Sequence, residues 1–257
     1  MKGLDIRKQK ILCAVVNDYL HCAEPVSSDA ICERYMRDIS PATVRNEMAE
    51  LEEAGFLKHP HTSSGRVPSD LGYRYFVNQL MKQKDLSRKE IEFMEKEYHR
   101  AGKNIEELLH ATLKIAATLS QLLAVVTAPK LPFKVLSSGL SNIARQPEFS
   151  DAGHIKDMLS IIEREDLMEH IIDDSAKDDA VIIKIGSEIK NKKIRDCSIV
   201  ISKYELDGEN MGAISIIGPT RMTYSKASSV VDAVSKTLKN ILTEKGSKDR
   251  VLEMRRK

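Results

Sequence analysis

The sequence contains no tryptophan and few aromatic residues of any kind, with 7 Tyr and 5 Phe among 257 residues. It has only 12 Gly and 8 Pro, which excludes a collagen-like chain and argues against low-complexity sequence. An excess of charge of one sign is lacking as well, because 40 Lys and Arg nearly balance 38 Asp and Glu. With 42% hydrophobic residues, this composition excludes a disordered polyelectrolyte and predicts a globular chain long enough for two domains.

The cysteines are few, and none belongs to a C-x-x-C pair. Cys13, Cys22, Cys32 and Cys197 are 9, 10 and 165 positions apart, which disfavours a zinc site or a redox centre. We interpret them as reduced packing residues of a cytoplasmic protein. The first residues are polar, and the sequence has no run of about 18 apolar residues. We therefore expect neither a signal peptide nor a membrane-spanning segment.

The placement of proline divides the chain into segments with different secondary-structure patterns. Four prolines interrupt short helical patterns before residue 83, whereas residues 86–128 lack proline and predict helix almost throughout. From residue 130, helical periodicity is mixed with β-branched runs, so the overall fold class is predicted to be α+β. The predicted parts are an N-terminal domain over residues 1–83, a helical connector over 84–129, a C-terminal domain over 130–245 and a charged tail over 246–257.

The first segment predicts three short helices. An apolar stripe over residues 6–20 indicates the first, and Ser27 or Ser28 is placed to cap the second. Ser40 directly precedes a proline, which combines a capping hydroxyl with a residue suited to the first helical position. This is the sharpest local signal in the chain, and it predicts a third helix over residues 42–53.

A hairpin is predicted after the third helix. The apolar pair Phe56 and Leu57 is followed by a polar tip around residues 61–65, which includes a glycine, and then by Val67. Three short helices and such a hairpin, or wing, are typical of a winged helix-turn-helix domain. In that fold the third helix enters the major groove and the wing lies along the backbone or minor groove.

The third helix and the wing supply the candidate DNA-binding residues. Arg forms bidentate bonds to guanine, Asn forms them to adenine, and the Thr methyl contacts thymine. We therefore predict base contacts from Thr43, Arg45 and Asn46. Nearby hydroxyl and guanidinium groups are expected to position the domain on phosphates. These phosphate-contacting residues are Ser40, Thr62, Ser63 and Arg66.

The same features have other interpretations. Winged helices also serve as protein–protein modules, and a polar residue on a helix surface is usually only solvated. Residues 1–80 carry 10 Lys and Arg against 11 Asp and Glu, whereas nonspecific nucleic-acid binders are normally basic. His59 and His61 flank Pro60, but two histidines without further ligands do not make a metal site, so we expect no bound metal.

The helical connector contains a repeat of apolar or small side chains at a spacing near 3.5, the pattern of a coiled-coil seam. Its positions are Ile105, Leu108, Thr112, Ile115 or Ala116, Leu119, Leu122 or Leu123, and Val126. The same pattern fits an amphipathic helix that packs on its own chain's C-terminal domain. Dimerisation and intrachain packing therefore both remain open for this segment.

The C-terminal domain is predicted to combine strands with covering helices. Two short helices are indicated within residues 158–172, strands over 181–185, 198–204 and 212–217, and a closing helix over 225–242. The sequence has no glycine-rich phosphate loop, no metal-ligand spacing and no clustered nucleophile and base. We therefore expect no cofactor and no enzymatic activity.

Several motifs resemble those of the heat-inducible transcription repressor HrcA family. In the N-terminal part they are residues 24–28 (EPVSS), 40–48 (SPATVRNEM), 51–57 (LEEAGFL) and 61–75 (HTSSGRVPSDLGYRY). Downstream, residues 139–142 (GLSN), 146–149 (QPEF), 195–198 (RDCS) and 218–224 (GPTRMTY) resemble the family's C-terminal GAF-like domain. The resemblance thus covers most of the chain.

The resemblance implies a repressor of chaperone operons. It would bind double-stranded DNA as a homodimer at an inverted-repeat operator of the CIRCE type, with help from a GroEL-type chaperonin, and would be released on heat stress. Only nine residues separate Pro129 from Gly139, where family members carry a much longer segment with early strands of the GAF-like domain and a dimerisation element. We therefore expect a truncated GAF-like domain over residues 130–245.

A second hypothesis, from a different functional class, is a small-molecule-responsive winged-helix regulator whose GAF-like domain binds an effector. The repressor hypothesis is favoured, since the motifs that carry the resemblance are long and specific. Because a palindromic operator needs two recognition helices, and one chain provides only one, a dimer is favoured.

Overall fold

The computed structural model describes residues 3–60, 65–102, 104–132, 134–162, 164, 181–206 and 209–243. The chain forms two compact units. The first contains the chain up to Lys82 together with Thr220–Thr223, and the second begins at Gln83. The segment predicted as a separate connector, residues 84–129, therefore belongs to the second unit.

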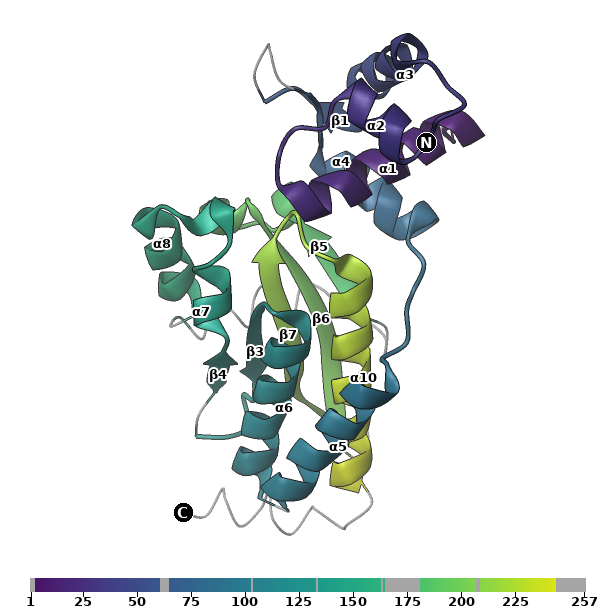
Figure 1. The fold of residues 1–257 in the computed structure, drawn as a ribbon. Coiled ribbons are helices and arrows are strands. Elements are labelled where there is room, and N and C mark those ends of the chain that lie inside the picture. Colours follow the sequence, from purple (N-terminus) through teal and green to yellow (C-terminus); the bar gives the residue numbers. More distant parts are fainter. Residues whose placement is uncertain are drawn as a thin grey trace. The chain divides into compact units, whose positions relative to one another are not determined.

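The first unit consists of helices followed by a two-stranded hairpin and a further helix (Figure 1). Its elements are α1 (Ile6–Cys22), α2 (Ser28–Arg34), α3 (Pro41–Glu53), β1 (Leu57–Lys58), β2 (Val67–Pro68), α4 (Asp70–Tyr75) and a π-helical turn (Phe76–Leu80). The two strands are antiparallel, with Leu57 opposite Pro68 and Lys58 opposite Val67. Three helices and a hairpin confirm the predicted winged helix-turn-helix.

Side-chain caps define where the first three helices begin. The Asp5 carboxylate accepts a hydrogen bond from the Lys8 amide at 2.9 Å, and Ser27 Oγ accepts one from the Ala30 amide at 3.1 Å. Of the two serines considered for α2, Ser27 is thus the cap. Ser40 caps α3, with proline at the first helical position as its sequence predicts.

The core of the first unit is formed by one apolar face of each helix and by the hairpin. Its central side chains are Ile11, Leu12, Val15, Val16, Ile31, Val44, Met48, Leu51, Leu57 and Tyr73, all at most 2% exposed. Phe56 directly precedes β1, and its ring meets that of Tyr75 in α4 edge to face, with centroids 5.4 Å apart. This packing fixes α3 and the wing on a common base.

The second unit is built on a five-stranded sheet of order β4-β3-β7-β6-β5, in which every neighbouring pair is antiparallel. Helices α6 and α10 lie along one face of this sheet, with α5 beside them (Figure 1). The strands are β3 (Leu123–Thr127), β4 (Val135–Ser138), β5 (Ile182–Ile185), β6 (Cys197–Leu206) and β7 (Glu209–Pro219). The predicted α+β class is confirmed.

Among the described residues, the helices of the second unit are α5 (Arg88–Ala101), α6 (Ile105–Ser120), α7 (Leu140–Ile143), α8 (Ala152–Ile162) and α10 (Tyr224–Thr243). The same part of the chain contains 3-10 turns at Pro147–Phe149, Gly186–Glu188 and Lys192–Ile194. Residues 165–180, where the end of the predicted helical region 158–172 falls, lie outside the described residues, as does the predicted charged tail.

The prediction of helix almost throughout residues 86–128 is wrong at its end. Helix α6 stops at Ser120, because Gln121 adopts a left-handed conformation with a φ of 56°. Residues 123–127 (LAVVT) then form the buried strand β3. A run of β-branched side chains fits the pleated, fully buried centre of a sheet better than a helix, and tertiary pairing on both edges decides the outcome.

The short segment before Gly139 contains a strand of the sheet. Strands β3 and β4 pair antiparallel from Ala124 opposite Ser138 to Thr127 opposite Val135. The short connection closes with a hydrogen bond from the Ala128 amide to the Lys134 carbonyl at 2.8 Å. The nine residues between Pro129 and Gly139 thus include strand β4, at the edge of the sheet.

The proposed coiled-coil seam faces the interior of its own unit. Leu108, Thr112 and Ile115 are at most 2% exposed, and α6 packs against α5, α10 and the sheet. The Tyr98 hydroxyl of α5 lies 2.9 Å from Thr112 Oγ1 and donates to the Val234 carbonyl of α10 at 3.3 Å. Of the two interpretations left open for the repeat, the structure supports intrachain packing.

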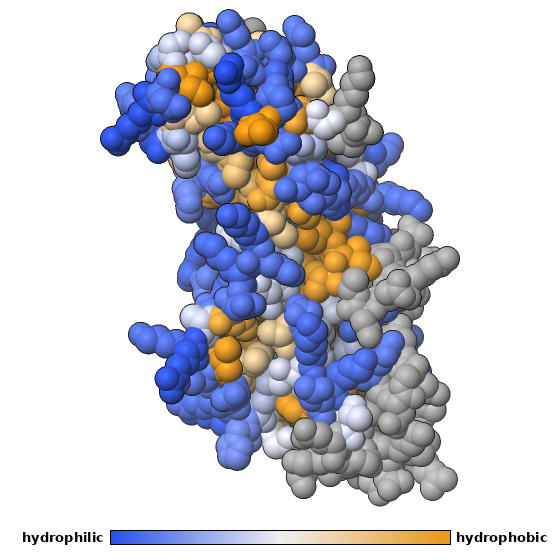
Figure 2. Space-filling view, turned by 90° about the vertical axis from the view of Figure 1, so that its right-hand side faces the viewer, coloured by the Kyte–Doolittle hydropathy of each residue, from blue (hydrophilic) through white to orange (hydrophobic). Residues whose placement is uncertain are grey.

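On the face shown in Figure 2, most of the coloured surface is hydrophilic, and apolar residues gather in patches. Among the described residues, the large apolar side chains classed as exposed are Ile6, Tyr35, Leu71 and Ile91. Within that same part of the chain, no helix has both the length and the apolar character needed to cross a bilayer.

Candidate nucleic-acid interface

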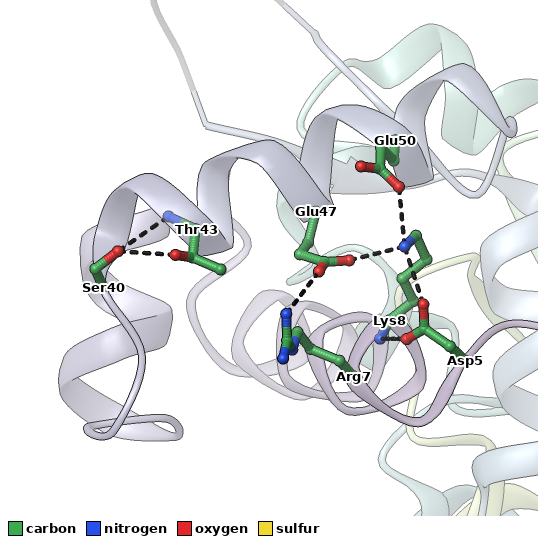
Figure 3. Close-up of polar contacts among 7 residues, drawn as sticks. All are labelled: Asp5, Arg7, Lys8, Ser40, Thr43, Glu47 and Glu50. Carbon is green, nitrogen blue, oxygen red and sulfur yellow. Dashed lines mark hydrogen bonds and ion pairs between the residues drawn. The ribbon is translucent and has the colours of Figure 1, made fainter.

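The N-terminal end of α3 presents polar groups in a fixed arrangement (Figure 3). Ser40 Oγ accepts a hydrogen bond from the Thr43 amide at 3.2 Å and lies 2.9 Å from Thr43 Oγ1. The first turn of a helix carries unpaired amides and a partial positive charge, which favours a nearby anion such as a phosphate. Ser40 and Thr43 are thus held at the end of α3 where an anion is favoured.

Arg45 and Asn46 follow on the exposed side of α3, whereas Val44, Met48 and Leu51 point into the core. The Arg45 guanidinium reaches toward α2, with Nη2 3.5 Å from Ser28 Oγ. Every sequence-predicted residue of α3 therefore lies in its first two turns and outside the core.

The acidic residues of α3 lie in its C-terminal half, where cations from α1 meet them (Figure 3). Arg7 Nη1 is 3.4 Å from Glu47 Oε1. Lys8 Nζ is 2.9 Å from both Glu47 Oε2 and Glu50 Oε2. Residues 41–46, which form the N-terminal half of α3, include no Asp or Glu. The end of α3 that is predicted to contact bases therefore carries no acidic side chain of its own.

The wing is joined to α3 through Glu52. Arg66 Nε donates to Glu52 Oε2 at 2.8 Å, and His59 Nδ1 lies 3.1 Å from Glu52 Oε1. Burial alone would raise the pKa of the Glu52 carboxyl, but the hydrogen bond and charge of Arg66, together with His59, outweigh it and lower the pKa. One carboxylate of α3 thus contacts a residue from each side of the hairpin.

Arg66 is less accessible than its sequence position suggests, since its side chain is only 14% exposed and its Nε is engaged by Glu52. His59 is likewise engaged, and no group of three metal-ligating side chains occurs in the part of the chain that the structure describes. Thr62 and Ser63, assigned to phosphates, lie outside the described residues, as does His61.

Lys8 and Glu52 are residues that sequence reasoning did not single out. Lys8 lies 39 positions before Glu47 and Glu52 lies 14 before Arg66, so neither pair follows a helical or strand spacing. Only the folded unit brings them together. A helix cap can be predicted from a local pattern such as a serine before a proline, whereas ion pairs between elements distant in sequence cannot.

Comparison with known proteins places the chain in a family. The family description "HrcA protein C terminal domain" matches residues 74–227. A relative from Carboxydothermus hydrogenoformans is 33% identical, with 94% of this chain and 99% of the relative covered. One from Pelotomaculum thermopropionicum is 31% identical, with 93% and 97% covered. Both are named heat-inducible transcription repressor HrcA.

These alignments extend over 340 and 337 positions, more than the 257 residues of this chain. The relatives therefore contain residues that have no counterpart here, in agreement with the predicted shortening. Among solved structures, a crystal structure described only as that of a hypothetical protein superposes with a TM-score of 0.80 at 17% identity. It covers 94% of this chain and 99% of that one, which supports the fold.

The family match covers more than half of the chain, and the sequence relatives extend through nearly all of it. The names of these relatives describe repressors of transcription, which act on DNA, and the family is not one of enzymes. The chain belongs to the HrcA family of heat-inducible transcription repressors.

Proposed function

We propose that this protein represses chaperone operons by binding, as a homodimer, an inverted-repeat operator of the CIRCE type, and that heat stress releases it. The observation that carries the DNA-binding part is the start of α3, where Ser40, Thr43, Arg45 and Asn46 lie together outside the core. In a winged helix-turn-helix this end of the third helix reads bases in the major groove.

The proposal assigns separate roles to these side chains. Arg45 and Asn46 read purine edges, Thr43 contacts a thymine methyl, and Ser40 lies near a phosphate at the helix N-terminus. Arg66, held by Glu52, contacts the backbone from the wing. Thr62 and Ser63 are proposed to do the same from the tip of the hairpin.

A homodimer is proposed because the chain has a single winged unit, while an inverted repeat has two half-sites. Two recognition helices must be spaced by about one helical turn of DNA, roughly 34 Å, or a multiple of it. The α6 seam does not supply the contact, since it is buried within its own unit. Such a repressor acts in the cytoplasm, where it reaches DNA, and a GroEL-type chaperonin is proposed to restore its active form.

A mobility-shift experiment tests the proposal. Purified full-length protein is titrated against the inverted repeat, a single half-site and a scrambled duplex, with and without a GroEL-type chaperonin, and the mass of the complex is measured. We expect binding to the repeat, with two chains per duplex, and a higher active fraction with chaperonin. Equal affinity for scrambled DNA would overturn the proposal, and a single chain on the full repeat would overturn the dimer.

A further inference from the structure

Lys8, in the first turn of α1, connects this helix to two successive turns of α3 (Figure 3). Its Nζ lies 2.9 Å from Glu47 Oε2, 2.9 Å from Glu50 Oε2 and 3.0 Å from Asp5 Oδ2. Asp5 in turn caps α1 by accepting a hydrogen bond from the Lys8 amide. One ammonium group thus joins the cap of α1 to the middle of the recognition helix.

The contact between Lys8 and Glu47 is largely shielded from solvent. The Lys8 side chain is 19% exposed and that of Glu47 13%, whereas Glu50 is 60% exposed. Contacts with Glu50, Glu47 and Asp5, in that order, raise the pKa of Lys8, so the ammonium stays charged. Without it, three carboxylates would lose the cation that they share, and Glu47 would keep its longer contact with Arg7, at 3.4 Å.

The position of Glu47 makes this contact relevant to DNA reading, because it directly follows Arg45 and Asn46 along α3. A shift at Glu47 would therefore move both predicted base readers. Lys8 itself is surrounded by carboxylates and is poorly placed to bind a phosphate. Arg7 is the contrasting neighbour, 57% exposed and in a single longer ion pair.

We propose that Lys8 is a positioning residue for the recognition helix. It fixes the rotation and depth of α3 relative to α1, and thereby presents Arg45 and Asn46 to base edges. The inference rests on the proposed function, since it concerns how the same interface is held. It also explains why Glu47 and Glu50 are compatible with a DNA-binding helix, because both are turned onto Lys8.

The main test compares Lys8→Met with Lys10→Met, an exposed lysine on the same helix. Affinities for the inverted repeat and for scrambled DNA are measured over a range of salt concentrations. We expect Lys8→Met to lower the ratio of the two affinities about tenfold, the effect of misplacing one base contact. The salt dependence should stay as in the wild type, because no phosphate contact is lost. Lys10→Met should leave the ratio unchanged.

Two results would overturn the proposal. One is an unchanged affinity ratio for Lys8→Met. The other is an equal loss on both DNAs with the slope of log K against log salt reduced by about 0.9, which marks Lys8 as a phosphate contact. If wild-type protein does not distinguish the repeat from scrambled DNA, the proposed function fails instead, and the inference with it.

Two further variants extend the test, and the first of them keeps it decisive if Lys8→Met unfolds. Glu50→Gln removes only the exposed arm of the cluster, and we expect it to lower the affinity ratio about twofold. In the double variant Lys8→Met with Glu47→Gln, the effects should be less than additive, because both changes break one contact. Wild-type ratios in Glu50→Gln and additive effects in the double variant would contradict the positioning role.

Discussion

At the scale of residues, the slight excess of acidic residues in the N-terminal part is offset locally, because several of its carboxylates form ion pairs. Glu47 and Glu50 are bound by α1, Glu52 is bound by Arg66, and Asp18 is 2.7 Å from Arg34. The cap at Ser40 was predictable, because a serine before a proline is a local signal. The Glu52–Arg66 contact was not, since it depends on the register of a hairpin.

Arg45→Ala is expected to weaken operator binding roughly tenfold or more and to relax preference at one base position, because a bidentate guanine contact is lost. The measurement is a binding titration on operators with single base changes. Arg37→Ala is the matched control, since Arg37 is exposed and its Nε donates to the Glu33 carbonyl four residues earlier in the chain. An equal loss on random DNA would show that Arg45 does not read bases.

Ser40→Ala is expected to reduce the free energy of unfolding by about 1 kcal/mol, the usual value of a helix N-cap. The Thr43 amide would lose its acceptor. Urea unfolding of the full chain measures the change, and Ser40→Asn should restore most of it because asparagine also caps. A Ser40→Ala variant as stable as wild type would mean that water replaces the cap without loss.

At the scale of elements, sequence periodicity identified α6 but not its partner. A spacing near 3.5 describes an apolar face, and such a face can pack on another chain or on a sheet of its own. Strand β3 was missed for a related reason, because short apolar runs fit a helix or a buried strand equally well. Its pairing with both β4 and β7 settles the matter only in the folded unit.

Leu108→Ala is expected to lower the free energy of unfolding by about 2–5 kcal/mol, as a buried leucine truncation does, without changing the oligomeric state. Leu108 is 2% exposed within the second unit. Denaturant unfolding and the mass in solution are measured together, with Thr118→Ala on the exposed side of α6 as control. If Leu108→Ala instead abolished a dimer without changing the free energy of unfolding, the apolar repeat of α6 would be an intermolecular contact.

Glu90 at the start of α5 should make stability depend on pH. The hydrogen bond from the Lys226 ammonium, then that from the Ser87 amide, lower its pKa to about 2 from the ordinary 4.5. Because the folded pKa is depressed, the stabilisation is complete above pH 4.5 and is lost as pH falls toward 2. Glu90→Gln should therefore show a shallower fall of unfolding free energy over this window.

The control for this measurement is Glu92→Gln, a 59% exposed residue of the same helix whose partner Arg88 is also exposed. Its unfolding free energy should follow the wild-type pH profile. Identical profiles for Glu90→Gln and wild type would contradict the link between the Lys226 contact and acid stability.

At the scale of the whole molecule, the chain combines a winged-helix unit with a second unit built on a five-stranded antiparallel sheet. The N-terminal fold and the position of helix α3 were predictable from helix caps, turn residues and family motifs. The order of the sheet and the place of α5 and α6 in the second unit were not, because they depend on contacts distant in sequence. The near-balance of acidic and basic residues bears on the proposed DNA binding. Without a large positive charge, the affinity for DNA must come from a few individually positioned side chains.

The salt dependence of operator binding tests this central claim most directly. Affinity of the full chain for the inverted repeat and for a scrambled duplex is measured from low to high salt, and the slope of log K against log salt is compared with about 0.9 per phosphate contact. The account predicts a shallow slope and a large operator preference that persists as salt rises. A steep slope with equal affinity for both duplexes would contradict it.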